Sequence, residues 1–104
     1  MSTMHPDIET LVQKLRETAK LLRDHQQLRW ADWLSNDAHR IHQLDFYGVE
    51  HLLSAFGGMG SLNDLVLQRH EGGVLLMHQE NNERLNLLRG EIYLLARKLK
   101  SEEL

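Results

Sequence analysis

Apolar residues recur at three- and four-residue steps in four segments of the chain, and this spacing is typical of amphipathic helices. The pattern predicts helices over about 7–26, 28–44, 46–56 and 82–100. A core is expected from the residues on the apolar stripes: Leu11, Leu15, Trp30, Leu34, Ile41, Leu52, Phe56, Leu88, Ile92 and Leu95. The sequence therefore predicts a mainly α fold, a compact bundle of about four helices in one domain over residues 1–104.

The segment before the last helix carries a different pattern. Two short apolar runs, Leu65–Leu67 and Val74–Met77, flank the turn signal His70-Glu71-Gly72-Gly73. A small β-hairpin near 65–77 and a short helix that starts this segment are both open interpretations. A hairpin this short needs to lie against the helices to be stable.

The last helix has a heptad-like seam. Its apolar residues alternate steps of three and four, at Leu85, Leu88, Ile92, Leu95 and Leu99. Such a seam is typical of a helix buried in a bundle, and equally of a homodimer formed through the C-terminal helix. Two repeats are too few to decide between them.

A glycine-rich stretch, Gly57-Gly58-Met59-Gly60-Ser61, follows the third helix. It lacks the lysine of a Walker phosphate loop and the Gly-x-Gly-x-x-Gly frame. A turn is therefore favoured over an anion-binding loop, with Met59 in the core and Ser61 capping the next element. We expect this loop to be a structural hub.

Two aspartates are predicted to have structural roles. Asp37 projects close to the apolar face of the second helix, and a buried carboxylate must find hydrogen-bond donors. The expected donors are the backbone N–H groups of residues 57–61. Asp45 is expected to cap the third helix by accepting from the N–H of Tyr47 or Gly48. A catalytic carboxylate pair is disfavoured, because nothing beside these residues suggests a reaction.

Metal, cofactor and enzyme chemistry are not indicated. The chain has no cysteine. His39 and His42 share a helix face, but two ligands do not make a metal site. The N-terminus lacks the basic start and apolar stretch of a signal peptide, and no apolar run is long enough to span a membrane. We expect a cytoplasmic protein without metal, cofactor or membrane association.

The charge is unevenly placed. The net charge is −3, and residues 28–64, with five acids against two bases, account for all of it. An acidic middle argues against nucleic-acid binding and favours a basic partner, although a plain solvated surface is the alternative. The predicted partner-facing residues are Asp32, Trp33, Glu50, Asp64 and Glu71, with Trp33 as the aromatic anchor if it is exposed.

Two motifs carry a family resemblance: Trp30-Ala31-x-Trp33-Leu34, and the run Phe56-Gly57-Gly58-Met59-Gly60-Ser61-x-Asn63-Asp64. Over roughly residues 8–100 the chain resembles a family of small uncharacterised bacterial domains. The resemblance implies an immunity protein encoded beside a polymorphic toxin, which binds and neutralises that toxin, and it supplies no site residues. The alternatives are a helical adaptor or self-associating module and, less favoured, a small hydrolase or nucleotide-binding enzyme using Asp37, Asp45 and the glycine loop.

Overall fold

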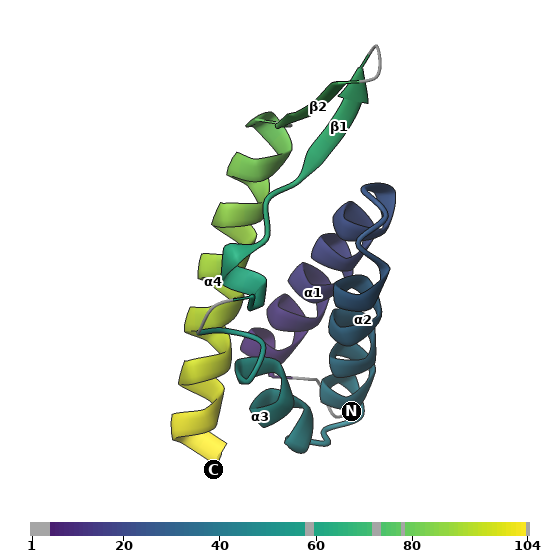
Figure 1. The fold of residues 1–104 in the computed structure, drawn as a ribbon. Coiled ribbons are helices and arrows are strands. Elements are labelled where there is room, and N and C mark those ends of the chain that lie inside the picture. Colours follow the sequence, from purple (N-terminus) through teal and green to yellow (C-terminus); the bar gives the residue numbers. More distant parts are fainter. Residues whose placement is uncertain (1–4, 58–59, 72–73, 78, 104) are drawn as a thin grey trace.

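The computed structural model describes residues 5–57, 60–71, 74–77 and 79–103 (Figure 1). The described chain is mainly helical, as the apolar spacing predicts. Its elements in order are α1 (Pro6–Asp24), α2 (Leu28–His42), α3 (Tyr47–Leu53), the 3-10 turn η1 (Leu62–Asp64), strands β1 (Gln68–Glu71) and β2 (Val74–Met77), and α4 (Gln79–Glu103). None of the described helices combines the length and the apolar content that crossing a bilayer demands.

The four described helices pack against one another in neighbouring pairs (Figure 1). Helices α1 and α2 make an antiparallel pair, α4 packs along α1, and the short α3 lies between α2 and the C-terminal half of α4. The strands form an antiparallel hairpin, in the region where the sequence allows one, with Gln68 opposite Met77 and Glu71 opposite Val74. The hairpin continues beyond the N-terminal end of α4, so the molecule is elongated, 54 × 30 × 20 Å.

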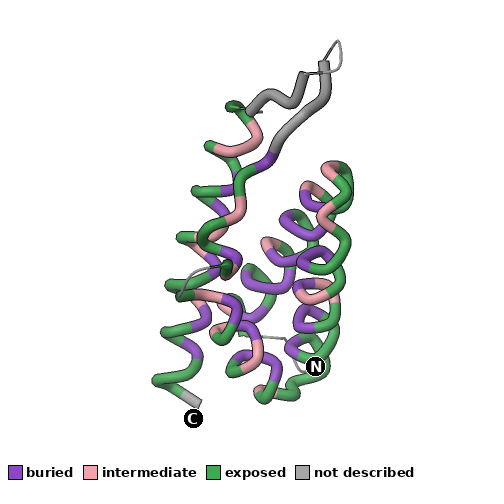
Figure 2. The backbone as a smooth tube through the Cα atoms, viewed as in Figure 1, coloured by how far each residue is buried: buried purple, intermediate pink, exposed green. Residues whose placement is uncertain are grey.

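The core lies where the helices face one another (Figure 2). Eight of the ten predicted core residues are buried, and Phe56 and Leu95 are half-buried. Phe56 falls outside the core because α3 ends at Leu53, earlier than predicted, and the ring lies instead against Tyr93 of α4. The apolar seam of α4 is largely buried against α1 and α3, so a helix within a bundle is the correct interpretation of that seam.

Helix α2 ends in an unusual turn. The Leu44 N–H donates to the Ile41 carbonyl and the Asp45 N–H to the Arg40 carbonyl, both at 2.9 Å. This is the Schellman arrangement, in which the residue after the helix is left-handed and is usually glycine. Here that residue is Leu44, with φ of 64°. Gln26 ends α1 in the same way, with φ of 60°.

The Asn82 side chain of α4 binds the residue that precedes the hairpin. The Asn82 amide accepts from the Leu67 N–H at 2.7 Å and donates to the Leu67 carbonyl at 2.8 Å, as a neighbouring strand would. The helix itself begins at Gln79, before the predicted residue 82. Asn82 thus joins the base of the hairpin to the first turns of α4.

Candidate functional site

Asp37 is completely buried on α2, and its Oδ1 lies 2.7 Å from Nδ1 of His51 on α3. The prediction that residues 57–61 supply its donors is therefore wrong. The cause is how closely α3 approaches α2 at Gly48. A Cβ added there would lie 3.0 Å from Arg40 Cβ and 3.1 Å from Ile41 Cγ1. This approach brings His51, about one turn after Gly48, to the buried carboxyl.

Burial raises the pKa of Asp37 to about 6, and the hydrogen bond and charge of His51 act in the opposite direction. Asp37 Oδ2 and Trp33 Nε1 are also buried and form no hydrogen bond of normal geometry with a described residue, but the Trp33 N–H and the Arg40 charge also act to lower the pKa of this carboxyl. The carboxyl still takes up a proton far more readily than an exposed aspartate. Asp37 and His51 form a hydrogen-bonded pair inside the α2–α3 interface.

Trp33 belongs to this cluster and is half-buried. Its ring stacks on His51 with centroids 4.3 Å apart and planes 17° apart, and it lies 5.1 Å from the Trp30 ring. Because His51 covers one face of the indole, Trp33 is poorly placed as the predicted aromatic anchor. The sequence did not predict His51 as the partner of Asp37. Its only signal was its position on a short amphipathic helix, four residues before Ala55.

The predicted acidic partner residues do not form one cluster. Asp32 is exposed on α2, where its Oδ1 lies 3.2 Å from the Arg23 guanidinium, and Glu50 is exposed on α3. Asp64 Oδ2 accepts from the Gly60 N–H at 2.7 Å and so belongs to the glycine loop. Glu71 lies on β1, and its side chain is outside the described part of the structure.

An exposed apolar corner lies beside Glu50 instead. We define the α2–α3 corner as Leu44, Asp45, Tyr47 and Glu50. Leu44 and Tyr47 are 57% and 61% exposed, and the Arg40 guanidinium lies 5.6 Å from the centre of the Tyr47 ring. Asp45 Oδ1 accepts from the Tyr47 N–H at 3.2 Å, as predicted, although the N-cap residue of α3 is Phe46 rather than Asp45. The corner therefore presents two large apolar side chains with carboxylates beside them.

The described part of the glycine loop is held by its own side chains. Ser61 Oγ accepts from the Asn63 N–H at 3.3 Å, and Asp64 closes the turn from the other side through Gly60. Gly57 and Gly60 are left-handed, with φ of 90° and 79°. Gly58 and Met59 lie outside the described residues, so the core position predicted for Met59 stays a prediction.

Arg89 of α4 fastens this loop to the bundle. Its Nη1 donates to the carbonyl oxygens of Leu62, Asn63 and Leu65 at 2.7, 3.1 and 3.0 Å. Burial lowers the pKa of Arg89, and the nearby Asp64 carboxylate acts against that effect. Arg89, which was not predicted from the sequence, thus joins the segment that follows the glycine loop to α4, and the role of residues 57–61 as a structural hub stays a prediction.

Beside this junction lies a groove of about 520 Å³, which we call the α3–α4 groove. One side comes from the end of α3 and the loop, and the other from one face of α4. Its lining includes three basic side chains and no acidic one. The lining residues include Asn63, Asn86, Arg89, Gly90, Tyr93, Arg97 and Lys100.

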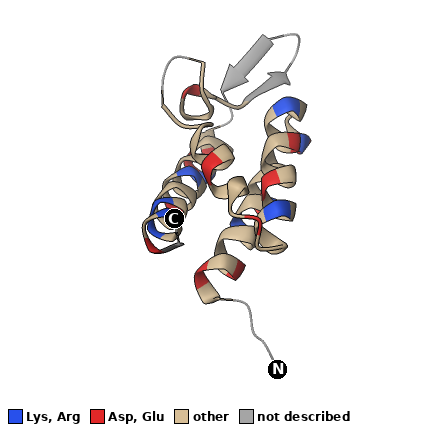
Figure 3. Cartoon of the chain, turned by 90° about the horizontal axis from the view of Figure 1, so that it is seen from below, with Lys and Arg blue, Asp and Glu red and all other residues tan. Residues whose placement is uncertain are grey.

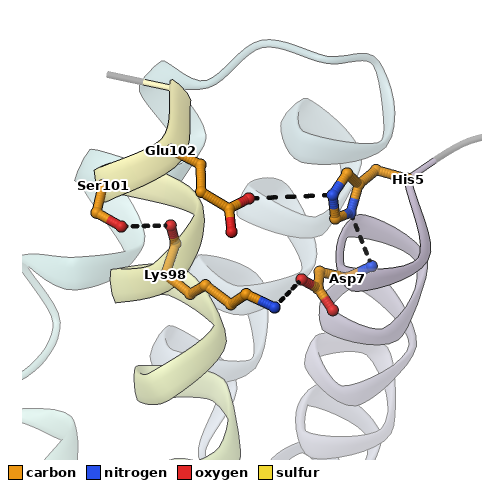
Figure 4. Close-up of polar contacts among 5 residues, drawn as sticks. All are labelled: His5, Asp7, Lys98, Ser101 and Glu102. Atoms are coloured by element: carbon orange, nitrogen blue, oxygen red, sulfur yellow. Dashed lines mark hydrogen bonds and ion pairs between the residues drawn. The ribbon is translucent and has the colours of Figure 1, made fainter.

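A polar cluster ties the two ends of the chain together (Figure 4). Asp7 Oδ2 lies 2.7 Å from Lys98 Nζ, and His5 Nε2 lies 3.9 Å from a Glu102 carboxylate oxygen. His5, Asp7 and Glu102 offer ligand atoms within 4.8 Å of one another. However, Lys98 already occupies Asp7, and His5 Nδ1 accepts from the Asp7 N–H at 3.0 Å. These contacts make the cluster a link between helix ends rather than a metal centre.

The fold and its surfaces define a small helical domain with an exposed apolar corner and a basic groove. The family described as a domain of unknown function, DUF6966, matches residues 23–76, and the chain belongs to this family. The matched segment runs from the end of α1 through the hairpin and includes both the corner and the glycine loop. No curated protein and no solved structure matches the chain.

Proposed function

We propose that this chain is a cytoplasmic immunity protein that binds a cognate bacterial toxin domain by direct contact and neutralises it. The observation that carries the proposal is Leu44, which keeps a left-handed backbone while its side chain is largely exposed. Together with the family resemblance of the sequence, this points to a protein-binding surface at the α2–α3 corner.

Leu44 has no packing reason to be leucine. A left-handed conformation costs an L-residue about 1–2 kcal/mol, which glycine avoids. An exposed side chain recovers little of that cost inside the domain. Glycine would form the same turn without this strain, and strained backbone is often found at functional positions. Leu44 and the adjacent Tyr47 therefore fit the role of anchors that fill a pocket on a partner.

The charge around the corner favours a basic toxin and disfavours nucleic acid as the partner. Both arginines of segment 28–64 lie over aromatic rings: Arg29 over Trp30 at 5.2 Å and Arg40 over Tyr47 at 5.6 Å. Glu50 has no ion-pair partner among the described residues. Carboxylates at the rim of an interface mainly raise the association rate of a basic partner.

The test uses the C-terminal domain encoded by the neighbouring reading frame, measured for toxicity, protection and binding. Leu44→Gly relieves the strain and removes the anchor, while Gln26→Gly relieves the same strain at the end of α1 and serves as the matched control. We expect both variants to be more stable than the wild type, and only Leu44→Gly to bind the toxin at least about tenfold more weakly. If the two variants bind the toxin with equal affinity, the corner is not part of the interface. If the domain encoded by the neighbouring reading frame is not toxic, the proposed immunity function is wrong.

The acidic rim has a separate test. Reversing Asp32 and Glu50 to lysine should slow association with the toxin and reduce its dependence on ionic strength, because fewer charges then steer the partner. The control reverses Asp24 and Glu80, two exposed acids outside segment 28–64. A rate that neither salt nor the reversal changes would show that the acidic middle is only a solvated surface.

A self-associating module is the second candidate, because α4 exposes two leucines on its outer face. Leu87 and Leu94 are 65% and 70% exposed and lie seven residues apart, so they share one face of the helix. This homodimer would use the outer face of α4 rather than the buried seam. Sedimentation over a range of concentrations should show a dimer that Leu94→Glu abolishes. A monomer at every concentration would exclude this candidate.

A further inference from the structure

Gly90 stands in the middle of α4, where glycine weakens a helix relative to alanine. Close packing does not explain it, because a Cβ added there would meet no atom within 4 Å. Gly90 lines the α3–α4 groove, so any side chain at this position would enter open space within it. A side chain larger than that of alanine at position 90 would therefore fill part of the groove.

The same groove collects positive charge: Asp64 lies near Arg89, but the two other bases of the groove have no acidic partner among the described residues. Other bases that face neighbouring helices are paired, as Lys98 is with Asp7 and Arg84 with Glu17. Arg97 and Lys100 line the groove, are exposed, and have no ion-pair partner in the described chain. Figure 3 shows basic residues around the C-terminal end of α4. A chain of net charge −3 thus carries a basic groove.

The middle of the groove offers a flat apolar surface and amide groups. Tyr93 is 40% exposed, and its ring lies 5.3 Å from that of Phe56, with the planes inclined by 60°. Asn63 and Asn86 line the groove near Arg89, and the Asn86 side-chain oxygen accepts from that guanidinium. Asparagine amides present a donor and an acceptor together, which matches the edge of a nucleobase.

These groups follow one another along α4. Asn86, Gly90, Tyr93, Arg97 and Lys100 recur at three- and four-residue steps and form a row about 21 Å long at 1.5 Å per residue. Amides lie at one end, the aromatic ring in the middle and the two free cations at the other end. A ligand that matches this order has a polar-edged ring at one end and an anionic chain at the other.

We propose that the α3–α4 groove binds a nucleoside polyphosphate. The base contacts Tyr93, its edge faces Asn63 and Asn86, and the phosphates lie against Arg97 and Lys100. A volume of about 520 Å³ is in the range of small-molecule sites. The groove shares no residue with the α2–α3 corner, so this site stands whether or not the chain binds a toxin.

Calorimetric titration of the full chain with ATP tests the site, with adenosine and inorganic triphosphate as the two halves of the ligand. Gly90→Leu fills the groove, and Gly90→Ala is its control because a methyl group leaves most of the space. Arg97→Gln with Lys100→Gln removes the cations. Arg16→Gln with Lys20→Gln, both exposed on α1, makes the same change of charge elsewhere.

We expect ATP to bind more tightly than adenosine or triphosphate, Gly90→Leu to abolish binding in a folded protein, and Gly90→Ala to retain it. Loss of the two groove cations should weaken ATP binding at least about tenfold, with no such effect from the α1 pair. The proposal fails if ATP does not bind, if Gly90→Leu binds normally, or if the α1 pair weakens binding equally. If triphosphate binds as tightly as ATP, the base does not contact the groove. If a single-stranded oligoadenylate binds more tightly than ATP, the ligand is a nucleic acid rather than a free nucleotide.

Discussion

Replacing Asp37 with asparagine tests whether the buried carboxyl takes up a proton near neutral pH. Asparagine keeps the shape of the side chain and an oxygen for His51 Nδ1–H, but it does not titrate. The native pKa of about 6 lies above the ordinary aspartate value of 3.8. The native state therefore binds the proton at a higher pH than the unfolded chain, and protonation stabilises the fold.

The magnitude follows from the shift. A rise of about two pKa units corresponds to about 3 kcal/mol at full effect. This contribution is complete below the unfolded pKa and is lost as pH rises through the native one. Between pH 7 and pH 5 it should add about 1.3 kcal/mol to the stability of the wild type relative to Asp37→Asn. All side chains other than residue 37 are the same in both proteins, so their contributions largely cancel in the difference.

Urea denaturation of both proteins at pH 5, 6 and 7 measures this difference directly. The wild type should gain stability relative to the variant as pH falls, and the carboxyl carbon of Asp37 should titrate near pH 6 by NMR. A constant difference over this range would mean that His51 keeps the carboxyl ionised.

Three further substitutions test the helix junctions by chemical denaturation. Arg89→Ala should destabilise the domain by about 2–3 kcal/mol, because three backbone carbonyls lose a charged donor. An equal loss of stability in Arg97→Ala would contradict this role of Arg89. Gly48→Ala should cost about 1–3 kcal/mol by forcing α3 away from α2, whereas Gly90→Ala should stabilise by about 1 kcal/mol. Gly57→Val should cost about 1–2 kcal/mol from its left-handed backbone alone, since its Cβ would meet open space; an unchanged midpoint would refute the strain.

Periodicity predicted the helices and most of the core because it reports which face of each helix is apolar. It does not report which residue of the next helix lies opposite. The burial of Asp37 was therefore predictable, but its pairing with His51 was not. That pairing depends on how deeply α3 packs at Gly48, which is a distance between helices rather than a property of either one.

The candidate surfaces were harder to predict for two reasons. The acceptors of Arg89 are backbone carbonyls, which any residue carries, so sequence gives no sign of them. The left-handed end of α2 is normally signalled by glycine, and leucine at position 44 hides it. The acidic segment was visible from composition, but only the fold shows that Asp32 and Asp64 already have partners within the chain.

The link between Asp7 and Lys98 has a consequence for the order of folding. It joins residues near the two ends of the chain, so forming it early would close almost the whole chain into a loop at a high entropic cost. The pairing of α1 with α2 joins neighbours in sequence and requires far less. The terminal link is therefore expected to form after the rate-limiting step, so that its strength governs how fast the folded domain opens and barely affects how fast it forms.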